Sequence, residues 1–222
     1  MKTKEKIYSL IEIGVKTAVG SLPGPISAAF NAVYDNVKEN VLNKRAEKWK
    51  EDVISRLEEL ETDYDNLINN ESFATALIKT SELAIKTQSD EKRKLLANAL
   101  VNTYSQNISE DKGIIFLQLV DKYTLLHIQI IRYLHDVYMK QTFFNNIELS
   151  YMAMFRLKFY KVDDTYLKKS IKDLQNDYLV ESFSDDAPVG FKNRRIELLT
   201  KLGNDFYDYL KSDEDKNEND YL

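Results

Sequence analysis

Apolar residues recur every three or four positions along most of the chain, a spacing typical of α-helices that bury one face. The longest such segment runs from Asn43 to Asn69. Ser72 can cap a following helix that extends to about Lys86, and Ser89 can cap another that extends to about Asn107. An apolar helix from Ile114 to Tyr123 comes next. The pattern predicts a mainly α protein.

The amino-terminal segment has the pattern of a helical hairpin. Apolar residues form a stripe from Ile7 to Val19, the prolines of Leu22 to Pro25 break the helix, and a second apolar helix runs from Ile26 to Val41. Two alternatives follow: the hairpin packs on its own core or in a homo-oligomer, or its lysines hold it on an anionic membrane surface. The residues expected to form the interaction are Leu10, Ile11, Val15, Phe30 and Val33.

The last third of the chain has the order of elements of a winged helix-turn-helix. Helices are expected from Thr124 to Val137, from about Leu149 to Phe159, and from Asp163 or Asp164 onward. The third helix takes the place of the recognition helix, which enters the major groove in DNA-binding winged helices. Its inward residues are expected to be Leu167, Ile171, Leu174 and Tyr178.

A small hairpin and a closing helix complete this pattern. Leu179 to Phe183 alternates like a half-buried strand, Asp185 to Gly190 holds turn residues, and Phe191 to Leu198 can return as the second strand. Thr200 is expected to cap the last helix, and Gly203 to permit close packing against a neighbour.

Basic residues of the third helix and the hairpin are the candidate nucleic-acid contacts of this region. Carboxylates in the same stretch, such as Asp173 and Glu181, would repel phosphate. The sequence therefore leaves two alternatives open, a solvated surface of mixed charge and a DNA-binding surface. The candidate contacts are Lys168, Lys169, Lys172, Lys192, Arg194 and Arg195.

These patterns predict four segments. Residues 1–42 form the hairpin, 43–112 a helical bundle, 113–211 the winged-helix domain, and 212–222 an acidic tail. The boundary between bundle and winged helix is expected at Ser109 to Gly113.

Composition narrows the chemistry. The 222 residues carry a formal net charge of −5, which argues against a generally basic coat for nucleic acid, and the absence of cysteine excludes disulfides and thiolate metal sites. The sequence shows neither a secretory signal nor a run of about 18 apolar residues. We expect a cytoplasmic protein, with membrane association through the hairpin left open.

Candidate catalytic groups are few. His127 and His135 lie about 12 Å apart on one expected helix, too far to share a metal ion. His127 is expected to be a helix-capping or partly buried packing residue, and the paired carboxylates lie at helix starts and turns. We therefore expect no catalytic residues, no bound metal, no cofactor and no enzymatic activity.

Several short motifs resemble the abortive-infection alpha family of bacterial proteins. They are the Leu-Pro-Gly-Pro elbow, Arg45-Ala46-Glu47-Lys48, the run from Glu91 to Ala97, the run from Leu126 to Leu134, and Leu199-Thr200-Lys201-Leu202-Gly203. The resemblance covers about residues 14–210 and implies a role in bacterial defence against phage. It brings no catalytic residues with it.

Two functions from different classes remain at this point. The first is a non-enzymatic antiviral defence protein that acts through a protein partner, a homo-oligomer or a membrane. The second is a DNA-binding transcriptional regulator with a helical oligomerisation domain.

Overall fold

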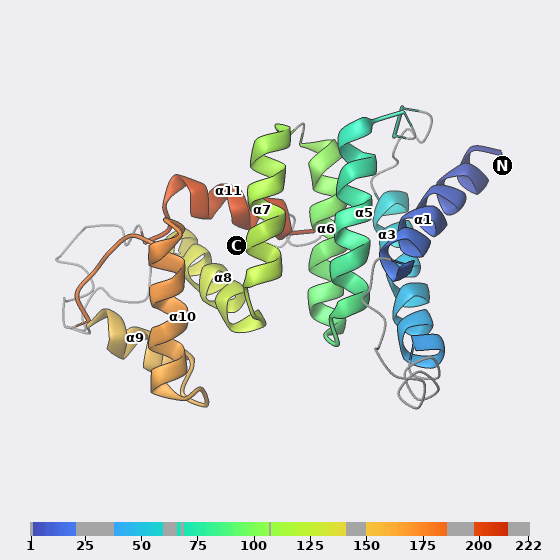
Figure 1. Cartoon of the computed structure of the whole chain (residues 1–222). Coiled ribbons are helices and arrows are strands. Elements are labelled where there is room, and N and C mark those ends of the chain that lie inside the picture. The colour runs from blue at the N-terminus through green and yellow to red at the C-terminus, as the bar shows by residue number, and fades with distance from the viewer. Residues whose placement is uncertain are drawn as a thin grey trace. The chain divides into compact units, whose positions relative to one another are not determined.

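The computed structural model describes residues 2–20, 38–59, 66–67, 69–106, 108–140, 150–185 and 198–212. These residues are almost entirely helical, which confirms the expected mainly α class (Figure 1). An isolated antiparallel β bridge joins Val180 and Leu199.

The chain divides into two compact units, one formed by residues 1–122 and 209–222 and the other by residues 123–208. The sequence analysis placed its boundary about ten residues earlier, at Ser109 to Gly113. Helix α7, Glu110–Lys122, belongs to the first unit because its apolar residues are buried there, with the Phe116 ring 5.1 Å from that of Tyr209.

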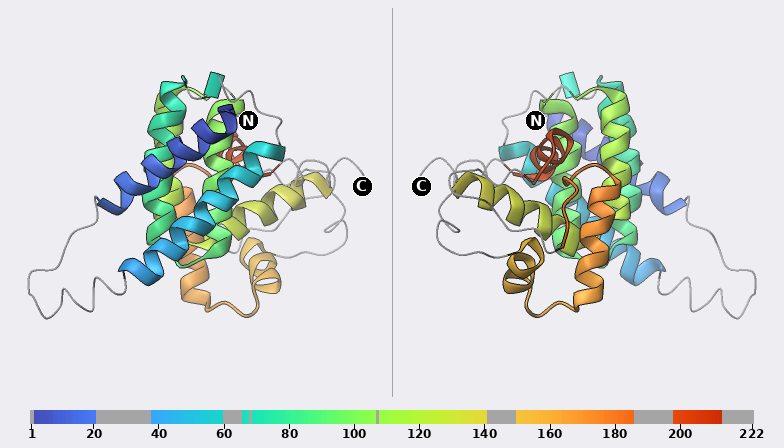
Figure 2. Two further views of the ribbon diagram at one scale, coloured as in Figure 1. Left: turned by 90° about the vertical axis from the view of Figure 1, so that its right-hand side faces the viewer. Right: turned by 90° about the vertical axis from the view of Figure 1, so that its left-hand side faces the viewer.

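The first unit is a bundle of α-helices, in which α5 (Glu71–Lys86), α6 (Asp90–Ser105) and α7 lie side by side (Figure 2). Helix α3 (Asn43–Glu59) packs on α5 and α6. A short π-helix, η1 (Lys38–Leu42), precedes α3. The bundle is closed by large side chains that are fully buried, including Trp49, Phe73 and Phe116.

Helix α1 (Lys2–Gly20), the first half of the expected hairpin, packs on α5 and α3. Ile11 and Val15 are buried, whereas Leu10 is half-buried. Gly14 permits the close approach, since a Cβ at this position would lie 3.1 Å from the Leu77 side chain. The chain's own bundle thus covers Ile11 and Val15, while Phe30 and Val33 lie outside the described residues.

Helix caps explain where the bundle helices begin. Ser89 Oγ accepts a hydrogen bond from Lys92 N at 3.0 Å, which confirms Ser89 as the cap of α6. The expected Ser72 cap is wrong, because Asn70 Oδ1 accepts from Phe73 N at 2.8 Å and caps α5 instead. Asparagine and serine both serve as N-caps, and the helix begins two residues earlier than expected.

The end of helix α11 (Lys201–Leu210) is held by polar side chains of α6. Asn98 and Asn102 donate to the carbonyls of Leu210 and Tyr209 at 2.9 and 3.0 Å, so two of the last carbonyls of α11 are satisfied. Thr103 Oγ1 lies 2.9 Å from Tyr209 Oη. Burial raises the pKa of Tyr209 to about 12, which keeps the phenol neutral.

The second unit contains α8 (Leu125–Lys140), α9 (Tyr151–Lys158), α10 (Asp164–Asn176) and the start of α11. Ser150 Oγ caps α9 through Ala153 N at 3.2 Å. Aromatic rings fill the space beside α9, with Phe155 6.1 Å from Tyr133 and 5.9 Å from Phe183. The three helices expected in this region are confirmed, with shifts of one to three residues at their ends.

The segment after α10 departs from the expected alternating strand. Leu179 and Val180 are both buried, and among the described residues of this segment only Val180 forms a β bridge. Leu179 lies against α11, where a Cβ on Gly203 would come within 2.1 Å of its carbonyl oxygen. Gly203 therefore has the close contact predicted for it. The expected return strand, 191–198, lies outside the described residues except for Leu198.

Thr200 joins the end of α10 to the start of α11. Its hydroxyl accepts from Gly203 N at 3.0 Å, as expected for a helix cap, and donates to the carbonyl of Tyr178 at 2.6 Å. Tyr178 was expected to face inward. It is instead 77% exposed with a backbone φ of 58°, because the chain turns sharply after Asn176 into the buried Leu179.

None of the described helices is by itself long and apolar enough to cross a membrane. By length and composition alone, the bent pair formed by α7 and α8 passes the same criterion together.

Candidate interaction surface of the second unit

Helix α10 is fixed at its start and along its inner face. Asp163 Oδ1 accepts from Thr165 N and Tyr166 N at 3.0 and 3.1 Å and so caps the helix. Leu167, Ile171 and Leu174 are buried, and α10 packs on α8. The opposite face, which carries the expected contact residues, is consequently exposed.

Two of the three lysines on this face are paired with carboxylates. Lys168 Nζ lies 3.4 Å from Asp185 and 3.8 Å from Asp164, and Lys169 pairs with Asp173 one turn away. Lys172 has no carboxylate partner among the described residues. The local field is therefore much less positive than the lysine count alone indicates, while Lys192, Arg194 and Arg195 lie outside the described residues.

An ion pair holds α9 against the first turn of α10. Arg156 donates to both oxygens of Asp164, from Nε at 2.6 Å and from Nη2 at 2.9 Å. These hydrogen bonds hold the pKa of Asp164 below its usual range. The two-point geometry fixes the relative orientation of the helices more tightly than a single lysine contact would.

A shallow pocket of about 250 Å³ opens beside Lys172. Its apolar wall comes from Met152, Ile171 and Phe183, and its polar edge carries Lys168 and Gln175 together with Asp185. The pocket thus combines residues of α9, α10 and the segment after α10. It can accept one apolar side chain of a partner next to a hydrogen-bonding group.

The start of α8 is tied to α10 by an aromatic and polar cluster. The Tyr123 hydroxyl donates to Asp177 at 2.5 Å, and its ring stacks on His127 with centroids 4.8 Å apart. The Tyr166 hydroxyl donates to Thr124 Oγ1 at 2.9 Å. Burial, reinforced by the Asp177 carboxylate, raises the pKa of Tyr123 far above its usual value, so this phenol remains a hydrogen-bond donor.

His127 is a buried capping residue, as expected. Its Nδ1 accepts from Thr124 N at 3.2 Å and lies 2.9 Å from Thr124 Oγ1. Its Nε2 lies 3.6 Å from Asp173. Burial raises the pKa of Asp173, but Lys169 and His127 outweigh it and leave that pKa below its usual value. The cluster therefore stabilises the junction of α8 and α10.

His135 lies apart from this cluster. Its ring is 4.3 Å from that of Tyr207, and its Nδ1 is 3.8 Å from Asp136 Oδ1. These two residues, adjacent in the sequence, therefore approach to ion-pair distance. Within the described part of the chain, no group of three or more histidine or carboxylate side chains is arranged to hold a metal ion.

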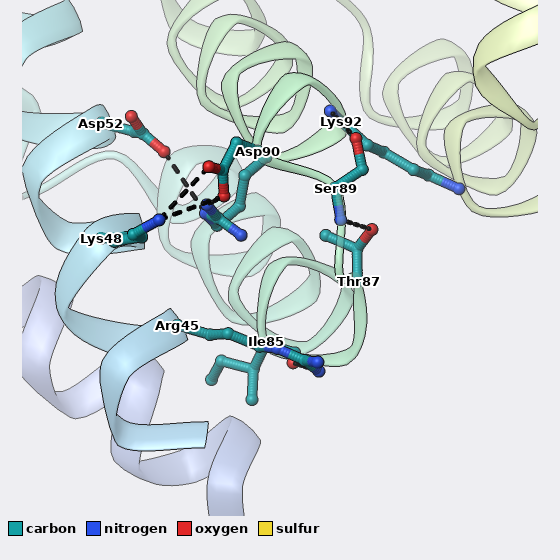
Figure 3. A network of polar contacts seen from close by, with 9 residues as sticks. Arg45, Lys48, Asp52, Ile85, Thr87, Ser89, Asp90 and Lys92 are labelled. Atoms are coloured by element: carbon teal, nitrogen blue, oxygen red, sulfur yellow. Dashed lines mark hydrogen bonds and ion pairs between the residues drawn. The ribbon is translucent and has the colours of Figure 1, made fainter. Parts of the chain in front are cut away.

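The first unit contains a second polar network, between α3 and the α5–α6 turn (Figure 3). Arg45 donates to the carbonyl of Ile85 at 3.2 Å, and Lys48 lies 3.2 Å from Asp90. The buried Arg93 pairs with Asp90 and has its Nε 3.6 Å from Asp52. Arg45 and Lys48 belong to one of the motifs that carry the family resemblance, and Arg93 belongs to another.

The two carboxylates of this network have pKa values shifted in opposite directions. Hydrogen bonds from Arg93 and Lys48 lower the pKa of the exposed Asp90, whereas burial raises the pKa of Asp52 despite the nearby Arg93. The network joins α3 to the end of α5 and to α6. The sequence analysis missed it because Asp52 and Arg93 are forty-one residues apart and share no local motif.

The described fold and surfaces define a mainly α protein of two units, with an exposed helix face on the second. Comparisons with models of known protein families, with curated proteins and with solved structures find no match. The resemblance to the abortive-infection alpha family thus rests on the sequence motifs.

Proposed function

We propose that this chain is a non-enzymatic bacterial antiviral defence protein of the abortive-infection type, which binds a macromolecular partner through its second unit. We further propose that this unit is a winged helix-turn-helix. The supporting observation is the order of α8, α9 and α10, the antiparallel bridge between Val180 and Leu199, and α11. The defence role itself is supported by the sequence motifs.

A protein partner fits the surface of α10 better than duplex DNA does. Carboxylates neutralise Lys168 and Lys169, so few charges remain for the phosphate contacts that dominate DNA binding. Tyr178 is 77% exposed at the end of α10. Tyrosine is enriched among the residues that dominate the energetics of protein interfaces.

Tyr178 also has an unfavourable backbone conformation. A φ of 58° costs a bulky residue about 1 kcal/mol relative to glycine, which is the common residue at such helix ends. Because the side chain is exposed, it contributes little to the core in return. A residue that is costly for folding and presented to solvent is a good candidate for partner contact.

We predict that Tyr178→Gly raises the free energy of unfolding by up to about 1 kcal/mol while it reduces protection against phage. Urea unfolding measures the first effect, and plaque counts on bacteria that express the full chain measure the second. Ile114→Ala, which removes an exposed apolar side chain from α7 of the first unit, is the comparison for protection. Full protection by Tyr178→Gly would remove Tyr178 from the proposed partner surface.

A DNA-binding regulator is the second candidate, favoured by the unpaired Lys172 among the described residues of α10. With Lys192, Arg194 and Arg195 it would complete a basic surface. A gel shift with random duplex DNA at low and moderate salt tests this, because phosphate contacts weaken steeply as salt rises. Charge reversal at Arg194 and Arg195 should lower the affinity and flatten its salt dependence. Unchanged DNA binding in that variant would move the contact surface elsewhere.

A further inference from the structure

The last residues of α9 and the turn that follows them expose two large apolar side chains. Leu157 is 66% exposed and Tyr160 is 74% exposed, although they lie only three residues apart. Phe159 between them packs edge-on against Tyr133, with ring centroids 5.8 Å apart. Phe159 therefore holds the turn against α8, and loose packing does not explain the exposure of Leu157 and Tyr160.

The backbone of the turn is also fixed. Phe159 N donates to the carbonyl of Phe155 at 2.8 Å, and Val162 N donates to the carbonyl of Phe159 at 2.9 Å. The Arg156–Asp164 ion pair joins the two flanking helices. The fold thus presents Leu157 and Tyr160 on a rigid support.

Two lysines flank these apolar side chains. Residues 157–162 contain Lys158 and Lys161 and no carboxylate, while the preceding Arg156 is paired with Asp164. Lys161 Nζ lies 5.5 Å from the centre of the Tyr160 ring, and Lys158 Nζ lies 5.6 Å from that of Tyr133. The long lysine stems can follow an apolar surface while their ammonium groups remain among polar groups.

We propose that this turn docks on an anionic lipid surface. Leu157 and Tyr160 enter the interfacial layer, and Lys158 and Lys161 bind the headgroup phosphates. Tyrosine is enriched at this depth of a membrane, and anionic lipids attract nearby lysines. This surface lies outside the α10 face of the proposed function and does not depend on it.

The size of the exposed patch favours lipid over a protein partner. Two exposed side chains fall far short of the roughly 800 Å² that each partner buries in a stable protein interface. A membrane surface needs only a few apolar anchors combined with cations. Nucleic acid would use the lysines but would leave Leu157 without an apolar environment.

The absence of cysteine permits a direct test in the full chain. Tyr160→Cys provides a single attachment site for an environment-sensitive fluorophore such as NBD. We expect its emission to rise at least twofold and shift to the blue with vesicles of phosphatidylglycerol and phosphatidylcholine, and not with phosphatidylcholine alone. Tyr178→Cys, labelled in the same way, is the matched control, because Tyr178 is similarly exposed in the same unit. Its emission should remain unchanged.

Vesicle co-sedimentation of unlabelled protein separates the contribution of the apolar side chains to binding from that of the lysines. Leu157→Ser with Tyr160→Ser, and separately Lys158→Glu with Lys161→Glu, should each reduce binding at least fivefold. Circular dichroism should show unchanged folding, because all four side chains are exposed. Lys172→Glu should leave vesicle binding as it is in the unmodified chain.

Three results would overturn the proposal. Unchanged vesicle binding in both double variants, with loss in Phe30→Asp, would assign membrane contact to the amino-terminal segment. Loss only in the lysine variant would show surface attraction without insertion. Absence of vesicle binding, combined with duplex DNA binding that requires Lys158 and Lys161, would make the turn a nucleic-acid contact. Each result is independent of phage protection, which tests the proposed function.

Discussion

Single residues at the junction of α10 and α11 determine how closely these two helices pack. Gly203 meets the carbonyl oxygen of Leu179, and no larger residue fits without movement of the backbone. Thr200 bonds to both sides of the same junction, through Gly203 N and the Tyr178 carbonyl. The sequence indicated both roles because glycine and threonine have specific local uses at helix starts.

Gly203→Ala should therefore destabilise the second unit by about 2 to 3 kcal/mol, since the new Cβ would lie 2.1 Å from the Leu179 oxygen. Gly113→Ala in α7 is the matched control. A Cβ there meets no atom within 4 Å, so the better helix propensity of alanine should stabilise the first unit by up to about 1 kcal/mol. Urea unfolding of the full chain measures both changes, and equal effects would contradict the close contact at Gly203.

Whole elements are positioned by polar contacts that join them, as the start of α10 illustrates. Its cap, Asp163, was identified from the sequence as one of two candidates. The partner of the neighbouring Asp164 was not identified, because Arg156 belongs to α9 and approaches only after the turn has formed. Capping is a local property of a few residues, whereas an ion pair between helices depends on how they pack.

The Arg156–Asp164 pair predicts a pH dependence of stability. The folded-state pKa of Asp164 is lower than its value of about 3.9 in the unfolded chain. The ionised carboxylate therefore stabilises the fold above that pH, and this contribution is lost as the pH falls through the folded-state pKa.

Asp164→Asn should consequently lower the free energy of unfolding at pH 7, with a difference from the unmodified chain that shrinks below about pH 4. Chemical denaturation across this pH range measures it. Asp111→Asn, an exposed aspartate in the first turn of α7, is the comparison. A difference that grows toward low pH would contradict the assigned direction of the pKa shift.

At the scale of the whole molecule, the amino-terminal helix is part of the first unit. Ile11 of α1 is fully buried, whereas Ile13 on the same helix is 56% exposed. The sequence left open whether this apolar stripe meets the protein's own bundle or something outside it. The structure shows that Ile11 and Val15 of this stripe are buried within the chain.

Ile11→Asp should therefore lower the free energy of unfolding by at least about 3 kcal/mol, because it places an unpaired charge in the core. Ile13→Asp should change it by less than about 0.5 kcal/mol. Thermal unfolding of both full-length variants checks this. A stable Ile11→Asp variant that has lost phage protection would instead indicate that α1 acts on an external partner.

The sequence by itself determined most of the described helices and most of their starts, because periodicity and capping depend on residues within one or two turns. It also identified Gly203 and Thr200 by the same local logic. Tertiary structure alone decided that α7 belongs to the first unit and that Lys168 pairs with Asp185. It also decided the exposure of Tyr178, Leu157 and Tyr160. The location of a unit boundary, the exposure of a side chain and an ion pair between distant residues all depend on packing between segments that are far apart in the sequence.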